Sequence, residues 1–239
     1  MNGSLLATLA LGFGLGLKHA LDADHLVAIC TIAGRERSMW RSSLIGALWG
    51  LGHTASLFVA AVCVIMLRVS ISPVLALSME FCAGIMLIAL STDLLRRVFR
   101  GEMQVHSHRH EHDGAEHAHL HVHAEGARDH THHGIGHKPF FVGVVHGLAG
   151  SAALTLFVLS TISSPWAGLL YVLVFGVGTI AGMLIMSSLI SLPFNLATRK
   201  LQGLVDPLQL GIGLGSFAFS LFYTWQIVAD DRLLGTFLQ

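Results

Sequence analysis

Two histidines and two carboxylates lie close together within apolar sequence, in the run Lys18-His19-Ala20-Leu21-Asp22-Ala23-Asp24-His25. Apolar residues flank this run at positions 5–17 and 26–32. An ionisable side chain at membrane depth costs about 2.5–3.5 kcal/mol to insert, and such groups usually mark an ion or substrate pathway. Imidazoles and carboxylates together form a ligand set that suits a divalent first-row metal ion. The run therefore predicts a metal site inside a membrane.

Helical geometry places three of these four groups on one face. At about 100° per residue, His19, Asp22 and His25 fall within about 120° of one another, whereas Asp24 points almost the opposite way. Asp24 can join them only if the helix unwinds, and irregular backbone at membrane depth must line a cavity or be buried in protein. We therefore expect a break between His19 and Asp24. The alternative is a soluble histidine-rich helix, or an acid–base pair that only stabilises a bundle.

The segment resembles the signature of the nickel/cobalt transporter (NiCoT) family, through the pattern His-x4-Asp-His at His19, Asp24 and His25. The run from position 17 to 25 is similar to that signature almost letter for letter, and a second family-like run follows at Leu51-Gly52-His53-Thr54-Ala55-Ser56. We expect no helix before the signature helix, so the chain is most similar to the short six-helix UreH-like nickel permeases. The resemblance implies transport of Ni²⁺, with Co²⁺ as a close competitor, and it favours uptake over efflux.

His53 stands alone in the second apolar segment. A lone buried histidine costs free energy unless it is paired, so we expect it to face the first helix, with a structural hydrogen bond as the alternative. The predicted ligands are His19, Asp24, His25 and His53, with Asp22 either as a fifth ligand or as the carboxylate that fixes a histidine tautomer. Three further residues are candidates for orienting a ligand or lining the ion's path: Lys18, Glu80 and His146.

The composition is that of a membrane protein. Of 239 residues, 53% are hydrophobic and 12% are charged, whereas soluble domains have about 25% charged residues. No basic region precedes the first apolar run, so we expect no cleaved signal peptide. The three cysteines lack the CxxC spacing of zinc or redox sites. We expect packing roles for Cys30, Cys63 and Cys82, with Cys30 alone near enough to the motif to be a soft ligand.

Apolar segments of about 20 residues, the length that spans a bilayer, predict an all-α polytopic membrane protein. Six helices are expected at residues 4–33, 42–68, 72–98, 139–163, 165–191 and 205–229. A shift of about 126 to 129 residues superposes His19 on His146 and Glu80 on Gln209, which indicates a 3+3 inverted repeat with its site at broken helices near the midplane. Glycines around His146 lead us to expect a break in the fourth helix as in the first. Chance similarity of glycine-rich stretches is the alternative.

Three parts follow: a first three-helix repeat (1–98), a histidine-rich loop (99–138) and a second three-helix repeat (139–239). The loop holds 12 of the 16 histidines: His106, His108, His110, His112, His117, His119, His121, His123, His130, His132, His133 and His137. Such tracts bind metals, and with few apolar residues we expect this one to lack a core and to be mobile when metal-free. It would gather, buffer or sense metal; a solvated linker is the alternative.

Lys and Arg concentrate in the first, third and fifth connections. Because basic short loops face the cytoplasm, we expect a cell-membrane protein with both termini outside and the histidine-rich loop cytoplasmic. The predicted partners are Ni²⁺ or Co²⁺ ions, membrane lipid and a cytoplasmic metallochaperone. No nucleic acid, nucleotide or cofactor is expected. The remaining alternatives are efflux, a metal sensor or reservoir without transport, and an intramembrane metalloenzyme, against which the absence of HExxH argues.

Overall fold

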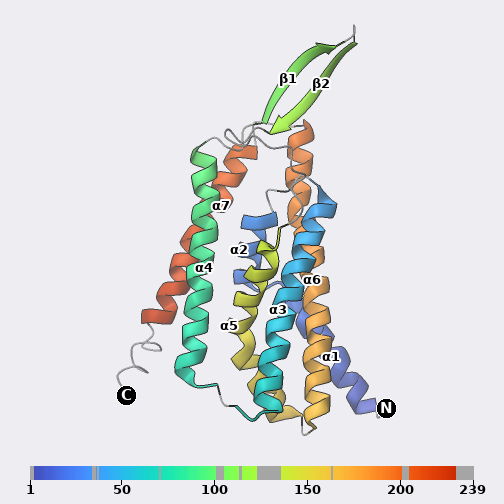
Figure 1. Ribbon diagram of the computed structural model, residues 1–239, viewed down its shortest axis with the longest axis vertical. Coiled ribbons are helices and arrows are strands. Elements are labelled where there is room, and N and C mark those ends of the chain that lie inside the picture. The colour runs from blue at the N-terminus through green and yellow to red at the C-terminus, as the bar shows by residue number, and fades with distance from the viewer. Residues whose placement is uncertain are drawn as a thin grey trace.

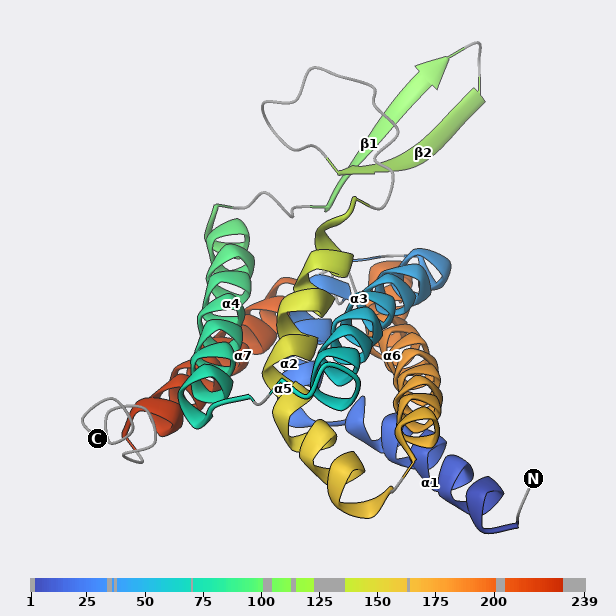
Figure 2. The same ribbon diagram turned by 60° about the horizontal axis from the view of Figure 1, so that its bottom comes forward.

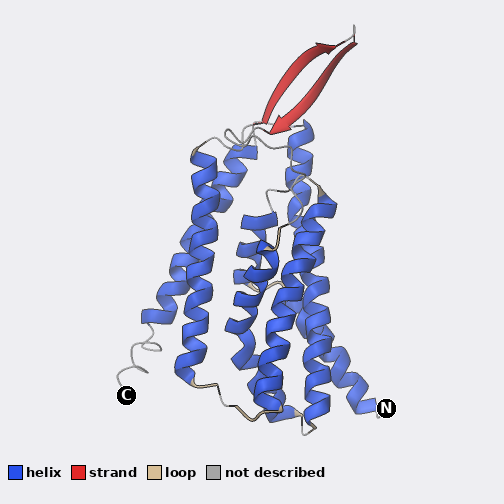
Figure 3. Ribbon diagram, in the orientation of Figure 1, coloured by secondary structure: helices blue, strands red, loops and turns tan. Residues whose placement is uncertain are grey.

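The computed structural model describes residues 3–33, 36, 38–69, 71–100, 105–112, 115–122, 136–162, 164–200 and 205–229. Within these ranges the chain is helical apart from one pair of strands (Figure 3). The elements are α1 (Gly3–His19), α2 (Ala23–Ile32), α3 (Met39–Ile65), α4 (Pro73–Phe99), β1 (Val105–His112), β2 (Ala115–Val122), α5 (Lys138–Thr161), α6 (Pro165–Lys200) and α7 (Val205–Ala229). The helices overlap the six predicted apolar segments, but the first segment is divided into α1 and α2, and α6 runs to Lys200, nine residues past the predicted end at 191.

The predicted break in the first helix is confirmed. Helices α1 and α2 meet at 55° across three residues. The backbone N–H of Leu21 donates to the Lys18 carbonyl at 2.9 Å, and that of Asp22 donates to the His19 carbonyl at 3.0 Å. These short-range bonds tighten the end of α1. Asp22 then takes an extended conformation, with φ −62° and ψ 147°, and begins α2.

The outer surfaces of the bundle are suited to lipid. Among the described residues, α3, α4, α6 and α7 each contain a stretch long and apolar enough to cross a membrane, and the bent α1–α2 pair passes the same test as one unit. Trp40, Trp166 and Trp225 lie near helix ends and are 75%, 75% and 62% exposed. Tryptophan is enriched at the two edges of a bilayer. The chain is therefore a multi-pass membrane protein.

The prediction of a broken fourth helix is wrong, because α5 continues without interruption past His146. The glycines near His146 serve close packing instead. A Cβ at Gly143 would meet the backbone carbonyl of Trp49, and a Cβ at Gly147 would approach that of His53. Small residues allow such close approach of helices in membranes. Helix α5 thus brings His146 to α3 as a regular helix.

The closest helix crossings involve glycine in both halves of the chain. Helix α3 packs against α5 and α6, α1 packs against α6, and α4 packs against α7 (Figures 1 and 2). A Cβ at Gly52 in α3 would meet the Phe140 carbonyl of α5, and a Cβ at Gly178 in α6 would meet the Phe13 carbonyl of α1. The α3–α5 crossing therefore has the same glycine-to-carbonyl contact as the α6–α1 crossing.

The histidine-rich stretch contains an antiparallel strand pair, so the all-α prediction is wrong there. In its Cα register three histidine pairs lie opposite one another: His106 and His121, His108 and His119, His110 and His117. Histidine at every second position has the two-residue period of a strand, although no apolar face signalled one. Figure 1 shows the hairpin projecting beyond the helices, at the end where α4 finishes and α5 begins. The first turn of α1 and the last turn of α7 lie at the opposite end.

Candidate metal centre

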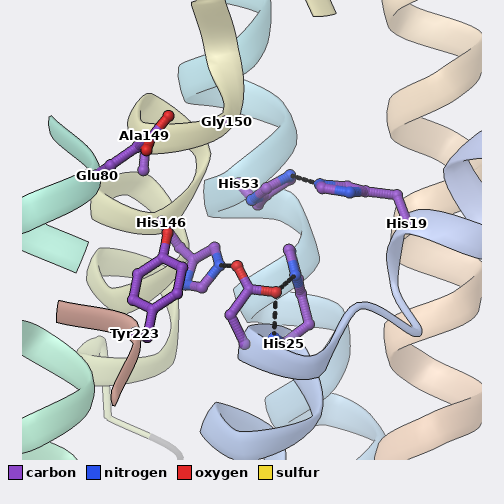
Figure 4. A pocket seen from close by; sticks show the side chains of 9 residues that line it. His19, His25, His53, Glu80, His146, Ala149, Gly150 and Tyr223 are labelled. Atoms are coloured by element: carbon purple, nitrogen blue, oxygen red, sulfur yellow. Dashed lines mark hydrogen bonds and ion pairs between the residues drawn. The ribbon is translucent and has the colours of Figure 1, made fainter. Parts of the chain in front are cut away.

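The bend between α1 and α2 opens onto a cavity of about 180 Å³ in the middle of the bundle. The residues that line it come from six helices: His19, Asp24, His25, His53, Glu80, His146, Ala149, Gly150 and Tyr223. Figure 4 shows His146, Glu80 and Tyr223 on one side of His25, and His19 on the other. Because no single helix supplies more than three of these nine residues, the site depends on the tertiary fold.

His19 is held by a carboxylate from the bend. Its Nδ1–H donates to Asp22 Oδ2 at 2.7 Å, so the neutral ring has its lone pair on Nε2. That atom faces His53 Nε2 at 3.3 Å, and the Nε2–H of His53 donates to it. The side chain of Asp22 is 51% exposed and does not line the cavity. Its position matches the role of fixing a histidine tautomer rather than that of a ligand.

Asp24 joins α2 to α5. Its Oδ1 accepts from the backbone N–H of His25 at 3.0 Å and from the ring Nδ1–H at 3.1 Å. Its Oδ2 accepts from His146 Nε2–H at 2.9 Å. An ionised carboxylate only accepts hydrogen bonds, so both imidazoles donate to it. His146, a candidate for orienting a ligand or lining the ion's path, belongs to the same cluster as the signature motif.

Three imidazole nitrogens around the cavity are left without partners. His25 Nε2, His53 Nδ1 and His146 Nδ1 are buried and have no hydrogen-bond partner among the described residues. The three side chains are 1%, 0% and 3% exposed. Buried polar atoms are nearly always paired, and a ring that donates through one nitrogen has a lone pair on the other. These unpaired lone pairs therefore indicate a site that binds an electron-pair acceptor.

Two overlapping sets of donor atoms have the spacing of metal sites. One ligand atom from each of His19, His25 and His53 lies within 4.8 Å of the others, and the same holds for Asp24, His25 and His146. Imidazole suits nickel, copper, zinc and iron, whereas magnesium and calcium prefer all-oxygen sites. The arrangement can therefore hold a divalent transition-metal ion.

Two aromatic residues that sequence reasoning did not single out fix the rings. Trp49 stacks on His25 with ring centroids 5.5 Å apart and planes at 28°. Phe175 lies 5.4 Å from the His19 ring. Trp49 lies one helical turn before His53, a spacing that could have drawn attention to it. Tyr223, which lines the cavity from α7, has no such signal in the sequence.

The other predicted residues lie in different places. Glu80 lines the cavity from α4, whereas Lys18 is exposed and Cys30 is half-buried, and neither lines it. Seven loop histidines lie in the two strands, namely His106, His108, His110, His112, His117, His119 and His121. His137 is exposed just before α5. Four more fall outside the described residues: His123, His130, His132 and His133.

Residues 5–221 match the NicO family, described as high-affinity nickel-transport protein. The chain is 37% identical over 230 residues to the urease accessory protein UreH of Bacillus sp. (strain TB-90), covering 96% of this chain and 95% of that protein. It is 42% identical over 59 residues to a high-affinity nickel transport protein of Cupriavidus necator, which covers 24% of this chain and 17% of that protein. No solved structure matches the chain.

Proposed function

Because this chain belongs to the NicO family of high-affinity nickel-transport proteins, we propose that it carries Ni²⁺ into the cell through the cavity of the bent α1–α2 helix pair. It is a transport protein and not an enzyme, and nickel is its substrate rather than a cofactor. Co²⁺, which accepts the same ligands, is the expected second substrate.

The ion binds to one ring nitrogen each of His19, His25 and His53. The observation that carries this proposal is the metal-site spacing of these three rings, two of which, His25 and His53, have a buried nitrogen without a partner among the described residues. Asp22 and Asp24 hold the opposite N–H groups of His19 and His25. Carboxylates in that place fix the tautomer and make the ligating nitrogen more basic. Their two negative charges also offset the charge of the ion, which lowers the cost of removing its water.

Alternating access rests on an inverted repeat of six membrane-spanning helices, with the α1–α2 pair equivalent to α5. The aromatic contacts of the site support this equivalence, since Phe175 lies beside His19 and Trp49 lies 5.7 Å from His146. The glycine contacts support it too. A Cβ at Gly84 in α4 would meet Thr224, and a Cβ at Gly213 in α7 would meet Leu95. A shift of 129 residues relates Gly84 to Gly213 and Leu95 to Thr224, so the two contacts are equivalent in the repeat. Rocking of the two halves about the site would expose it to each side in turn.

The histidine-rich hairpin lies on the cytoplasmic side, where it collects metal that has crossed and passes it to a chaperone. Basic residues support this orientation, because they gather at the hairpin end of the helices: Arg41, Arg96, Arg97, Arg100 and Lys138. At the other end the described connections contain only Arg68 as a basic residue. Short basic loops stay in the cytoplasm. Both termini are then outside, and the exposed apolar faces contact lipid.

The test is ⁶³Ni²⁺ movement into proteoliposomes that hold the protein in known orientation, with and without a proton gradient. We expect saturable flux from the termini side to the hairpin side that His25→Ala abolishes. The control is Cys82→Ala, which changes an exposed side chain outside the cavity and should leave the flux unchanged. Flux in the opposite sense would show efflux, and binding without flux would show a sensor or reservoir.

A further inference from the structure

We propose that the cavity contains a second metal position, formed by Asp24, His25 and His146, which holds the ion before it reaches His19 and His53. The inference rests on the proposed function and adds a handover step to it. In this step the ion passes from one ring nitrogen of His25 to the other while the remaining ligands change.

The donor geometry of this second position is already assembled. Asp24 Oδ2 accepts from His146 Nε2–H at 2.9 Å and Asp24 Oδ1 accepts from His25 Nδ1–H at 3.1 Å, and the three residues form one of the two sets with metal-site spacing. An ion that binds between them displaces these two N–H protons, which the unpartnered nitrogens His146 Nδ1 and His25 Nε2 take up. His146 is 3% exposed, and its Nδ1 has no partner among the described residues. A carboxylate with two imidazoles is a common ligand set for divalent transition metals.

His25 prevents the two positions from being filled together. It belongs to both donor sets, and its ring lies 4.5 Å from that of His19 and 4.3 Å from that of His146. A neutral imidazole offers a single lone pair, so His25 serves one ion in one position at a time. The ion therefore moves by exchanging Asp24 and His146 for His19 and His53, and it is never without a protein ligand.

The shape of the cavity gives the order of the two positions. Glu80, Ala149 and Gly150 line the part of the cavity beside His146, whereas His19 lies across His25 from them (Figure 4). The carboxylate of Glu80 adds negative charge on that side, which favours a cation there. The His146 position, on the side of Glu80, is thus the first on the path. The three-imidazole position, which includes the 24% exposed His19, is the second.

The test uses Co²⁺ as an absorption probe on the purified full-length protein, with His25→Ala as the background, because that variant loses both positions and leaves only the loop. Above this background, we expect His53→Gln to bind Co²⁺ with an altered spectrum and affinity lower by about tenfold or more. Adding His146→Gln to His53→Gln should abolish the remaining signal. His146→Gln alone should keep the wild-type spectrum but transport ⁶³Ni²⁺ at least about tenfold more slowly.

Glutamine at position 146 retains an N–H that can donate to Asp24 but has no imidazole lone pair, so it separates ligation from orientation. Wild-type transport by His146→Gln would show that His146 only positions Asp24 and would overturn the proposal. Loss of all Co²⁺ signal in a His53→Gln protein that still elutes as a folded monodisperse species would overturn it as well. If the wild type itself does not differ from His25→Ala, the intramembrane site of the proposed function fails, which is a separate result.

Discussion

At the scale of single residues, the site is a set of imidazoles whose outer N–H groups are held by acids. Asp22 binds His19, while Asp24 binds both His25 and His146. Such carboxylate–histidine pairs set which nitrogen is free and how strongly it binds a metal. This arrangement explains why two acids stand beside two histidines in the motif, although the proposed ligands of the three-imidazole position are all nitrogens.

Removing the Asp22 carboxylate should weaken metal binding without unfolding the protein. In Asp22→Ala, His19 loses the acceptor that fixes its tautomer, so we expect the apparent affinity of transport for Ni²⁺ to fall by about 10- to 100-fold. Asp22→Asn retains an acceptor oxygen, so its apparent affinity for Ni²⁺ should lie between those of Asp22→Ala and the wild type. Initial rates of ⁶³Ni²⁺ uptake over a range of concentrations measure the change.

The control is Asp93→Asn. Asp93 pairs with Arg97 away from the cavity, so this variant should transport like the wild type. Equal affinity in Asp22→Ala would show that the carboxylate does not orient the ring.

The motif predicted which residues of α1, α2 and α3 would gather, because ionisable groups in apolar sequence must find one another. It did not predict the pairing of Asp24 with His146. These residues are 122 positions apart, and a single sequence holds no measure of distance between separate helices. Tyr223 was missed for a related reason, since an aromatic residue in an apolar helix does not differ in pattern from its lipid-facing neighbours.

At the scale of elements, the same residue type has two uses that a sequence does not distinguish. The glycines near His146 predict an unwound turn like the one at His19, but only the first helix is broken. The break occurs where Asp24 cannot share one helical face with His19, Asp22 and His25. In α5 no such conflict exists, and the glycines allow contact with α3. Helix bounds were predictable because bilayer thickness sets them; the use of each glycine depends on its neighbour.

The repeated crossings make a matched prediction. Gly52→Ala and Gly178→Ala each place a methyl group against a backbone carbonyl of the facing helix. We expect each to destabilise the protein by about 1–3 kcal/mol, the usual cost of overpacking. The measurement is the apparent melting temperature in detergent. If α3 and α6 are equivalent, the two substitutions should lower the melting temperature by similar amounts.

Gly211→Ala is the control for these substitutions, because nothing lies within 4 Å of a Cβ at that position. Alanine favours a helix over glycine by about 1 kcal/mol, so this variant should melt at the wild-type temperature or above it. A large decrease in melting temperature in Gly52→Ala with no decrease in Gly178→Ala would contradict the equivalence of the two halves.

At the scale of the whole molecule, the two ends of the bundle are expected to face different compartments. In a chain whose three cysteines are replaced by alanine, single cysteines at Val69 or Ser164 should react with a membrane-impermeant maleimide in intact cells. A cysteine at Gly136, on the hairpin side, should react only after the cells are opened. All three positions are described, and Val69, Ser164 and Gly136 are exposed. The reverse labelling pattern would invert the membrane orientation and with it the case for uptake.

The acids at the bend of α1 and α2 also determine how the transport cycle responds to voltage. With neutral imidazoles, the empty centre has two negative charges from Asp22 and Asp24, and a bound divalent ion cancels them. Moving one charge through 100 mV is worth about 2.3 kcal/mol. A potential that is negative inside therefore has little effect on the step that reorients the loaded centre, and it drives the empty centre back toward the outside. Membrane voltage would thus return the transporter to its starting state after each ion is released.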